Sequence, residues 1–186
     1  MEFLTKLALL KQLKLGVKMI YYNIIDNKKV FFESDIIFAD YEAKVANTEE
    51  QKEYYFEKAK QSKLAELDTF HDSKEVKYLI IKIGNLQTGI FVNQDYRYLI
   101  DEQRQLLAIR KEAGEANPTW LYQNGITLPL DLKTLNQIRL YIGKLTDDNF
   151  RAKANNIRAI NNFKTIEELE KFDIKTNYRF NQILTF

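Results

Sequence analysis

The residue types that most often perform catalysis are scarce in this chain. It has 186 residues, no cysteine and a single histidine, His71. Thiolate nucleophiles, thiolate metal sites, disulfides and any mechanism that needs two imidazoles are therefore excluded. His71 lies beside Asp72 and follows Glu66 and Asp68, but a metal ion needs three or four converging ligands. We interpret His71 as the end of a helix, where it caps carbonyl groups or complements the helix dipole.

Three other patterns resemble catalytic motifs and have simpler structural interpretations. Glycosidase carboxylates flank the scissile bond from different elements, whereas Asp147-Asp148 indicates a bend in a long helix and Glu167-Glu168 indicates helix capping. The segment Gly84–Gly89 (GNLQTG) lacks the Lys-Ser/Thr of a phosphate-binding loop, so it predicts a hairpin turn. We expect no catalytic residue, no metal and no cofactor, and hence a protein that is not an enzyme.

The charge composition gives no reason to expect nucleic acid as a partner. The chain has 28 basic and 26 acidic residues and a net charge of +2, without the strong positive excess of a nucleic-acid-binding domain. Arg151, Lys153 and Arg158, with asparagines between them, could contact phosphates. Because acidic residues lie close by in sequence, we interpret this stretch as a solvated helix face.

Residues 1–17 (MEFLTKLALLKQLKLGV) predict an amphipathic helix. Apolar side chains recur at steps of three or four residues with lysines between them, and those lysines interrupt the apolar run that a secretory signal would need. This helix could pack on its own domain, dock into a groove of a partner, or lie on an anionic membrane. For docking, the residues expected to bind are Phe3, Leu4, Leu7, Leu10 and Leu13. No stretch reaches about 18 uninterrupted apolar residues, so no membrane span is expected.

The rest of the chain alternates short strands with helices. A hairpin over 18–32 turns at Asp26-Asn27-Lys28, the apolar run to Tyr41 could add a third strand, and a helix follows from Asn47 to Phe70. In the C-terminal half, the patterns predict strands at 78–83 and 89–92, a helix at 93–113, an Asn124-Gly125 hairpin, a helix at 131–162, and a last helix from Thr165 to Phe172.

These elements predict an α+β fold made of small β-hairpins packed with helices, preceded by the amphipathic helix. We expect a docking helix at 1–17, a hairpin region with a linking helix at 18–58, and a compact C-terminal domain at 59–186. One face of the Asn124-Gly125 hairpin is aromatic through Trp120 and Tyr122. We add these two residues to the expected partner-binding set, because tyrosine and tryptophan are common at protein interfaces.

Three segments of the C-terminal half resemble a domain-of-unknown-function family of phages and prophages. They are KLAELDTFHDSKEVKYLIIKIG, WLYQNGITLPLDLKTLNQIRLYI and TIEELEKFDIKTNYRF. The family is encoded near tail fibre genes, including in crAss-like phages of gut bacteria, and the resemblance covers about residues 59–186. Its pattern contains no catalytic residue to carry over.

The resemblance implies a virion structural protein of the tail or another appendage, with a fibre attachment point as its expected place, assembled in the host cytoplasm. Such a protein would act through contacts with other virion proteins, as a homo-oligomer or as part of a larger assembly. One alternative is a tail fibre assembly chaperone that is absent from the mature virion. Another is a carbohydrate-binding module that recognises a host receptor, since aromatic side chains also stack on sugars.

Overall fold

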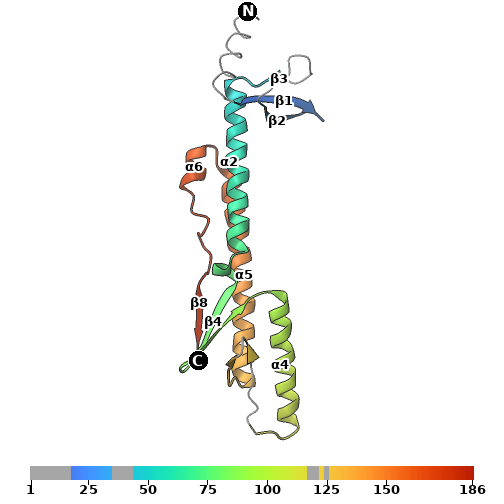
Figure 1. The fold of residues 1–186 in the computed structure, drawn as a ribbon, viewed down its shortest axis with the longest axis vertical. Helices are drawn as coiled ribbons and strands as arrows, with labels where there is room; N and C mark the ends of the chain where they lie inside the picture. Colours follow the sequence, from blue (N-terminus) through green and yellow to red (C-terminus); the bar gives the residue numbers. More distant parts are fainter. Residues whose placement is uncertain (1–17, 35–43, 117–121, 124–125) are drawn as a thin grey trace, which may run out of the picture. The chain divides into compact units, whose positions relative to one another are not determined.

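The computed structural model describes residues 18–34, 44–116, 122–123 and 126–186, and the fold is α+β (Figure 1). The predicted amphipathic helix at 1–17 lies outside the described residues, as does most of the possible third strand before Tyr41. The chain divides into two compact units, residues 1–61 and 62–186.

The first unit contains a three-stranded antiparallel sheet in the order β2-β1-β3. Its strands are β1 (Met19–Ile25), β2 (Lys28–Ser34) and β3 (Lys44–Val45). The predicted hairpin is confirmed, because β1 and β2 pair and the turn residues Asp26 and Asn27 have φ angles of 50° and 60°. Asparagine and aspartate tolerate this left-handed conformation better than other non-glycine residues.

The predicted long helix is also confirmed as α2 (Thr48–His71). The Asn47 side chain accepts hydrogen bonds from the backbone N–H groups of Glu49 and Glu50, and the Glu50 carboxylate accepts one from the N–H of Asn47. This reciprocal cap satisfies backbone donors that the first turn of a helix leaves unpaired.

The second unit is built on a three-stranded mixed sheet in the order β5-β4-β8. Strand β4 (Tyr78–Ile83) pairs antiparallel with β5 (Leu86–Phe91) and parallel with β8 (Gln182–Thr185). The turn is only Gly84-Asn85, with Gly84 at φ 53°. The prediction that the whole of GNLQTG forms the turn is therefore wrong, since Gly89 lies inside β5.

Helices of the second unit are α3 (Lys74–Lys77), α4 (Gln94–Glu112), α5 (Leu132–Asn162) and α6 (Ile166–Lys171). Three of them, α4, α5 and α6, begin where the capping signals predict, whereas the short α3 was not predicted and its N-cap, Ser73, makes no side-chain capping hydrogen bond. Asn93 caps α4, Asp131 caps α5, and Thr165 with Glu168 forms the predicted capping box at α6. A short antiparallel pair, β6 (Tyr122–Gln123) and β7 (Ile126–Thr127), precedes α5.

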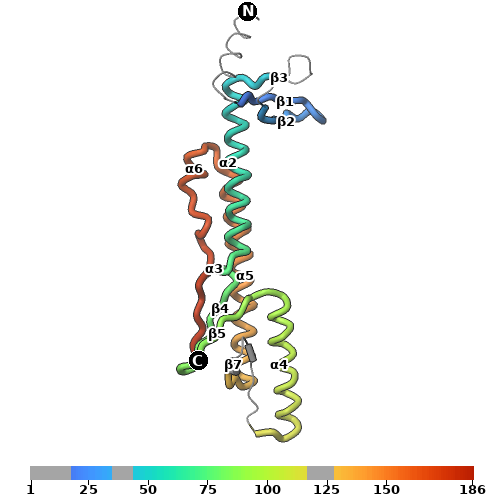
Figure 2. The backbone as a smooth tube through the Cα atoms, in the orientation of Figure 1, coloured from blue at the N-terminus to red at the C-terminus, as the bar shows by residue number. Residues whose placement is uncertain are grey.

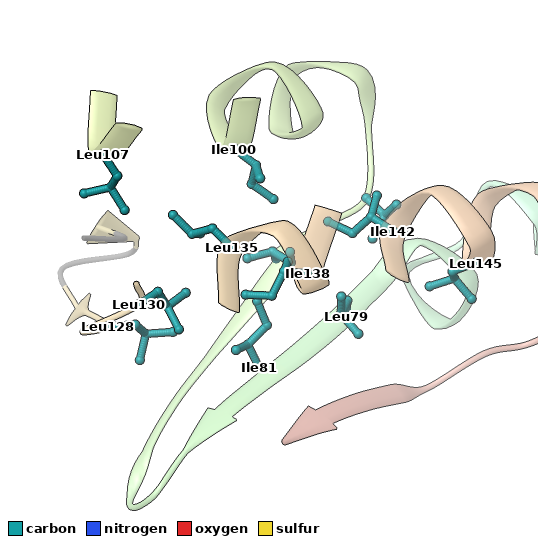
Figure 3. Close-up of a cluster of buried hydrophobic side chains, with 12 residues drawn as sticks. Leu79, Ile81, Ile100, Leu107, Leu128, Leu130, Leu135, Ile138, Ile142 and Leu145 are labelled. Atoms are coloured by element: carbon teal, nitrogen blue, oxygen red, sulfur yellow. The ribbon is translucent and has the colours of Figure 1, made fainter. Parts of the chain in front are cut away.

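The core of the second unit lies between one face of the β5-β4-β8 sheet and helices α4 and α5 (Figure 3). After α6 the chain runs back to the sheet, where β8 lies beside β4 (Figure 2). The buried core side chains are Leu79, Ile81, Ile90, Val92, Ile100, Leu107, Leu128, Leu130, Leu135, Ile138, Ile142 and Leu145.

Candidate interaction surfaces

The structure leaves the predicted partner-binding residues largely untested. Phe3, Leu4, Leu7, Leu10, Leu13 and Trp120 lie outside the described residues. Tyr122 belongs to β6, and only its backbone is described.

Five aromatic residues of the first unit contact one another. Tyr22 and Phe31 lie opposite each other in the hairpin with ring centroids 5.7 Å apart, and Phe31 contacts Tyr54 of α2 at 5.9 Å. Tyr21 stacks on Phe32 at 5.7 Å. These five rings stabilise the unit itself, so the large number of aromatic residues is not by itself a sign of a partner.

The second unit exposes an apolar face on the side of its sheet that the helices do not cover. Side chains alternate along a strand, so with Leu79 and Ile81 buried in the core, Tyr78 and Ile80 point to the other side. The strand register places Phe91 beside Tyr78 and Ile183 beside Ile80. We call Tyr78, Ile80, Phe91 and Ile183 the outer sheet face.

The outer sheet face is accessible and hollowed. Ile183 is 52% exposed and Tyr78 is 38% exposed. A shallow hollow of about 300 Å³ lies over Tyr78, Ile80 and Ile183, with Lys74 and Glu75 among its polar lining residues. Within the described chain, β5 and β8 are the edge strands of this sheet, and an edge strand can pair with a strand of another chain.

A second surface of the same unit is a basic groove along α5. Leu140 is 76% exposed and lines two adjoining hollows of about 750 and 390 Å³. The charged side chains around them are six basic and two acidic residues: Arg104, Lys111, Lys133, Arg139, Lys144, Arg151, Asp147 and Asp148. Arg151 was noted in the sequence, but Leu140 was not, because a single exposed leucine leaves no periodic signal.

The basic, asparagine-rich stretch of α5 is only partly the solvated face that we expected. Asn156 is buried and its Nδ2 donates to the carbonyl groups of Ile174 and Thr176, at 2.9 and 3.1 Å. Lys153 forms an ion pair with Asp68 at 2.7 Å. Arg151 and Arg158 are exposed, as predicted.

His71 ends α2 as expected, but it is buried, with 6% of its surface exposed. Its Nδ1 lies 3.2 Å from the hydroxyl of Tyr178, and its ring packs against Phe150. Burial lowers the pKa of His71, and the charges of Lys153 and Lys77 lower it further. Burial also raises the pKa of Tyr178 to about 12, so at neutral pH we expect an uncharged imidazole against an uncharged phenol.

One residue of each acidic pair has a structural partner. Asp148 pairs with Arg179 at 3.1 Å, and α5 continues without interruption through Asp147. The Glu168 carboxylate accepts hydrogen bonds from the backbone of Lys164 and Thr165, which lowers its pKa. Among the described residues, no group of three or more His, Asp or Glu side chains is arranged to hold a metal ion.

Comparison with known proteins finds no matching family model, no similar curated protein and no similar solved structure. None of the described helices combines the length and the apolar character needed to cross a membrane.

Proposed function

We propose that this protein is a non-enzymatic structural protein of a phage virion, in the tail or at a fibre attachment point, that holds neighbouring virion proteins. The observation that carries the proposal is the outer sheet face, an open apolar surface on an otherwise well-packed unit. The resemblance of the C-terminal half to a phage domain family supports the virion setting.

Contiguous exposed apolar area is a common mark of a protein interface. Covering Ile183 and Tyr78 with a partner removes apolar surface from water, at a gain of roughly 25 cal/mol per Å². The adjacent β8 edge offers backbone hydrogen bonds to the same partner, so one neighbour could engage both features. An assembly protein gains specificity from this combination of backbone pairing and side-chain contacts.

The basic groove along α5 supports contact with more than one neighbour. It surrounds the exposed Leu140 with an excess of positive charge, and it favours an acidic surface by charge complementarity. A component that links neighbours needs at least two separate surfaces, and homo-oligomerisation could use either of them. The segment 1–17 remains a proposed third docking element.

The decisive experiment is quantitative mass spectrometry of purified particles from a phage that carries the gene, compared with the infected-cell lysate. A structural component is expected at a fixed copy number in particles. Presence in the lysate but absence from particles would instead support the fibre assembly chaperone. Binding of the full chain to host glycans, with no protein partner, would support the carbohydrate-binding alternative.

A matched pair of substitutions tests the outer sheet face. Ile183→Lys places a charge on that face, whereas Ile109→Lys places one on an isoleucine of α4 that is 62% exposed. Both side chains are solvent-accessible, so both variants are expected to fold. Incorporation into particles should fall for Ile183→Lys and remain at the wild-type level for Ile109→Lys. The reverse pattern would assign the interface to α4 instead.

Deletion of residues 1–17 tests the docking helix separately. If this segment docks onto a virion partner, the truncated protein should fold normally and be depleted from particles. Incorporation at the wild-type level would show that the segment is not the attachment element.

A further inference from the structure

The second unit contains a cavity of about 220 Å³ that the proposed structural role does not use. It lies where the end of α2, the start of α4 and the middle of α5 meet. One water molecule needs only about 10–15 Å³ of such space, so the cavity has room for a small organic molecule. Its apolar walls are Val76, Val92, Leu145 and the Phe150 ring.

Arg97 brings a positive charge to this cavity without a counter-charge from the described residues. The Arg97 Nε is buried and has no hydrogen-bond acceptor in the described part of the chain. The other two cations near His71 are paired, Lys77 with Asp72 and Lys153 with Asp68. The Arg97 side chain as a whole is only half-buried, but a buried N–H group without an acceptor costs free energy, so an acceptor at its Nε would be favourable.

The start of α4 adds to the positive potential. Asn93 and Gln94 line the cavity, and they cap and begin a helix of 19 residues. The amino end of a helix carries a partial positive charge that favours anions. Lys77 also lines the cavity. Lys77 is paired with Asp72, and Asp95 in the first turn of α4 offsets part of the helix potential, so Arg97 is the cation that the polar side of the cavity presents. The opposite side is apolar with two rings, Phe150 and His71.

We propose that this cavity binds a small organic carboxylate. The carboxylate group contacts Arg97 and the start of α4, and the apolar body of the ligand packs against Val76, Val92 and Phe150. A carboxylate accepts hydrogen bonds from the planar guanidinium in a favourable geometry. The lining offers a single guanidinium and mostly apolar walls, so a singly charged ligand with an apolar body fits better than a compact, highly hydrated anion. This site is independent of the virion role.

Benzoate is a suitable probe, because it joins one carboxylate to one ring. In ¹⁵N-edited NMR titrations of the full chain, benzoate should shift resonances of Gln94, Arg97 and Phe150, whereas uncharged benzamide should not. Arg97→Gln should weaken benzoate binding by about tenfold or more, through loss of a charge-assisted hydrogen bond. Retained affinity in this variant would overturn the proposal. Equal binding of inorganic phosphate would overturn the assigned ligand class.

A second variant keeps the test independent of any folding defect in Arg97→Gln. Gln94 is exposed and one helical turn before Arg97, so Gln94→Glu can supply the missing carboxylate from within the protein. This variant should lose benzoate binding and melt at a higher temperature than the wild type. The matched control is Gln105→Glu, at an exposed position in the middle of α4, which should bind benzoate like the wild type. Unchanged benzoate binding by Gln94→Glu would contradict a carboxylate site at Arg97.

Discussion

Asn149 of α5 holds the backbone of Arg179 through two hydrogen bonds. Its Nδ2 donates to the Arg179 carbonyl and its Oδ1 accepts from the Arg179 N–H, both at 2.8 Å. The amide thus pairs with the C-terminal segment as a neighbouring strand would, three residues before β8 begins. Because Asn149 is only 3% exposed, water cannot easily replace it. We call these two hydrogen bonds the Asn149 clamp, and they help to hold β8 against β4.

Replacing Asn149 with alanine should therefore destabilise the second unit. The loss leaves two backbone groups of Arg179 without their partners, at a cost of about 1–3 kcal/mol, which urea denaturation would measure. Amide hydrogen exchange in β8 should accelerate in the same variant. Asn155 is exposed on the same helix, so Asn155→Ala is the control and should be neutral or slightly stabilising, since alanine is the better helix former. Equal destabilisation by both variants would argue against a clamp at Asn149.

Gly89 and Tyr78 should show energetic coupling across the outer sheet face. Ile80 lies opposite Gly89, and the Tyr78 ring occupies the space that a Cβ at Gly89 would take. Gly89→Ala should therefore displace the ring and destabilise the protein by about 1 kcal/mol. In a Tyr78→Ala background the same change should become neutral or stabilising, because alanine favours a strand more than glycine does. A double-mutant cycle measures this difference, and additive effects would mean that the two residues do not interact.

Local signals in the sequence predicted the helices of the structure well. Asn47, Asn93, Asp131 and Thr165 were each recognisable as helix caps, and each cap makes its hydrogen bonds within four residues. Likewise, the hairpin turn at Asp26-Asn27 depends on the conformational preferences of those two residues. Such features depend on neighbouring residues alone, and for that reason a single sequence is enough to predict them.

Features that depend on distant contacts were missed. Strand β8 has four residues, and its parallel partner β4 lies about a hundred positions earlier, so no local pattern marks it. Phe150 of α5 is a large apolar residue, yet it is 58% exposed, beside His71. A usable signal did exist in α5: Asn149 and Asn156 are two helical turns apart and take positions on the buried stripe, next to Leu145, Ala152 and Ile160. Polar residues at such positions indicate buried hydrogen bonds.

The C-terminal fragment 59–186 should fold on its own. It contains every residue of the core cluster between the sheet and helices α4 and α5, together with all three strands of the β5-β4-β8 sheet. We expect a single cooperative unfolding transition by calorimetry and by circular dichroism. A broad or non-coincident transition would place the domain boundary elsewhere.

His71 should make the stability of the second unit sensitive to mild acid. Burial lowers its pKa, with further lowering by Lys153 and Lys77 and a partial opposing effect of Asp72 and Asp68. Just below pH 6.5, the ordinary pKa of histidine, His71 therefore binds a proton in the unfolded chain but remains uncharged in the folded protein.

The free energy of unfolding should consequently fall as the pH drops below about 6.5 and through the lowered pKa of the folded state, with the full contribution of His71 present above pH 6.5. In His71→Gln the same curve should be flatter over this range. Carboxylates such as Glu33 and Glu50, whose pKa values are lowered in the folded state, affect stability only at more acidic pH. An unchanged slope in His71→Gln would show that His71 titrates alike in both states.

Asp101 should couple α4 to α5 through a salt-sensitive network. Its carboxylate lies 2.7 Å from Arg104 of its own helix and 3.0 Å from Arg139 of α5. Partial burial raises the pKa of Asp101, but the two guanidinium groups outweigh that effect and the net pKa is lowered. Because all three side chains are about one-third exposed, the Asp101–Arg139 pair should contribute only about 0.2–1 kcal/mol. A double-mutant cycle with Asp101→Asn and Arg139→Gln should give that coupling at low salt and a smaller one in 1 M NaCl. A coupling that does not change with salt would mean that the pair acts through packing of the arginine side chain and not through its charge.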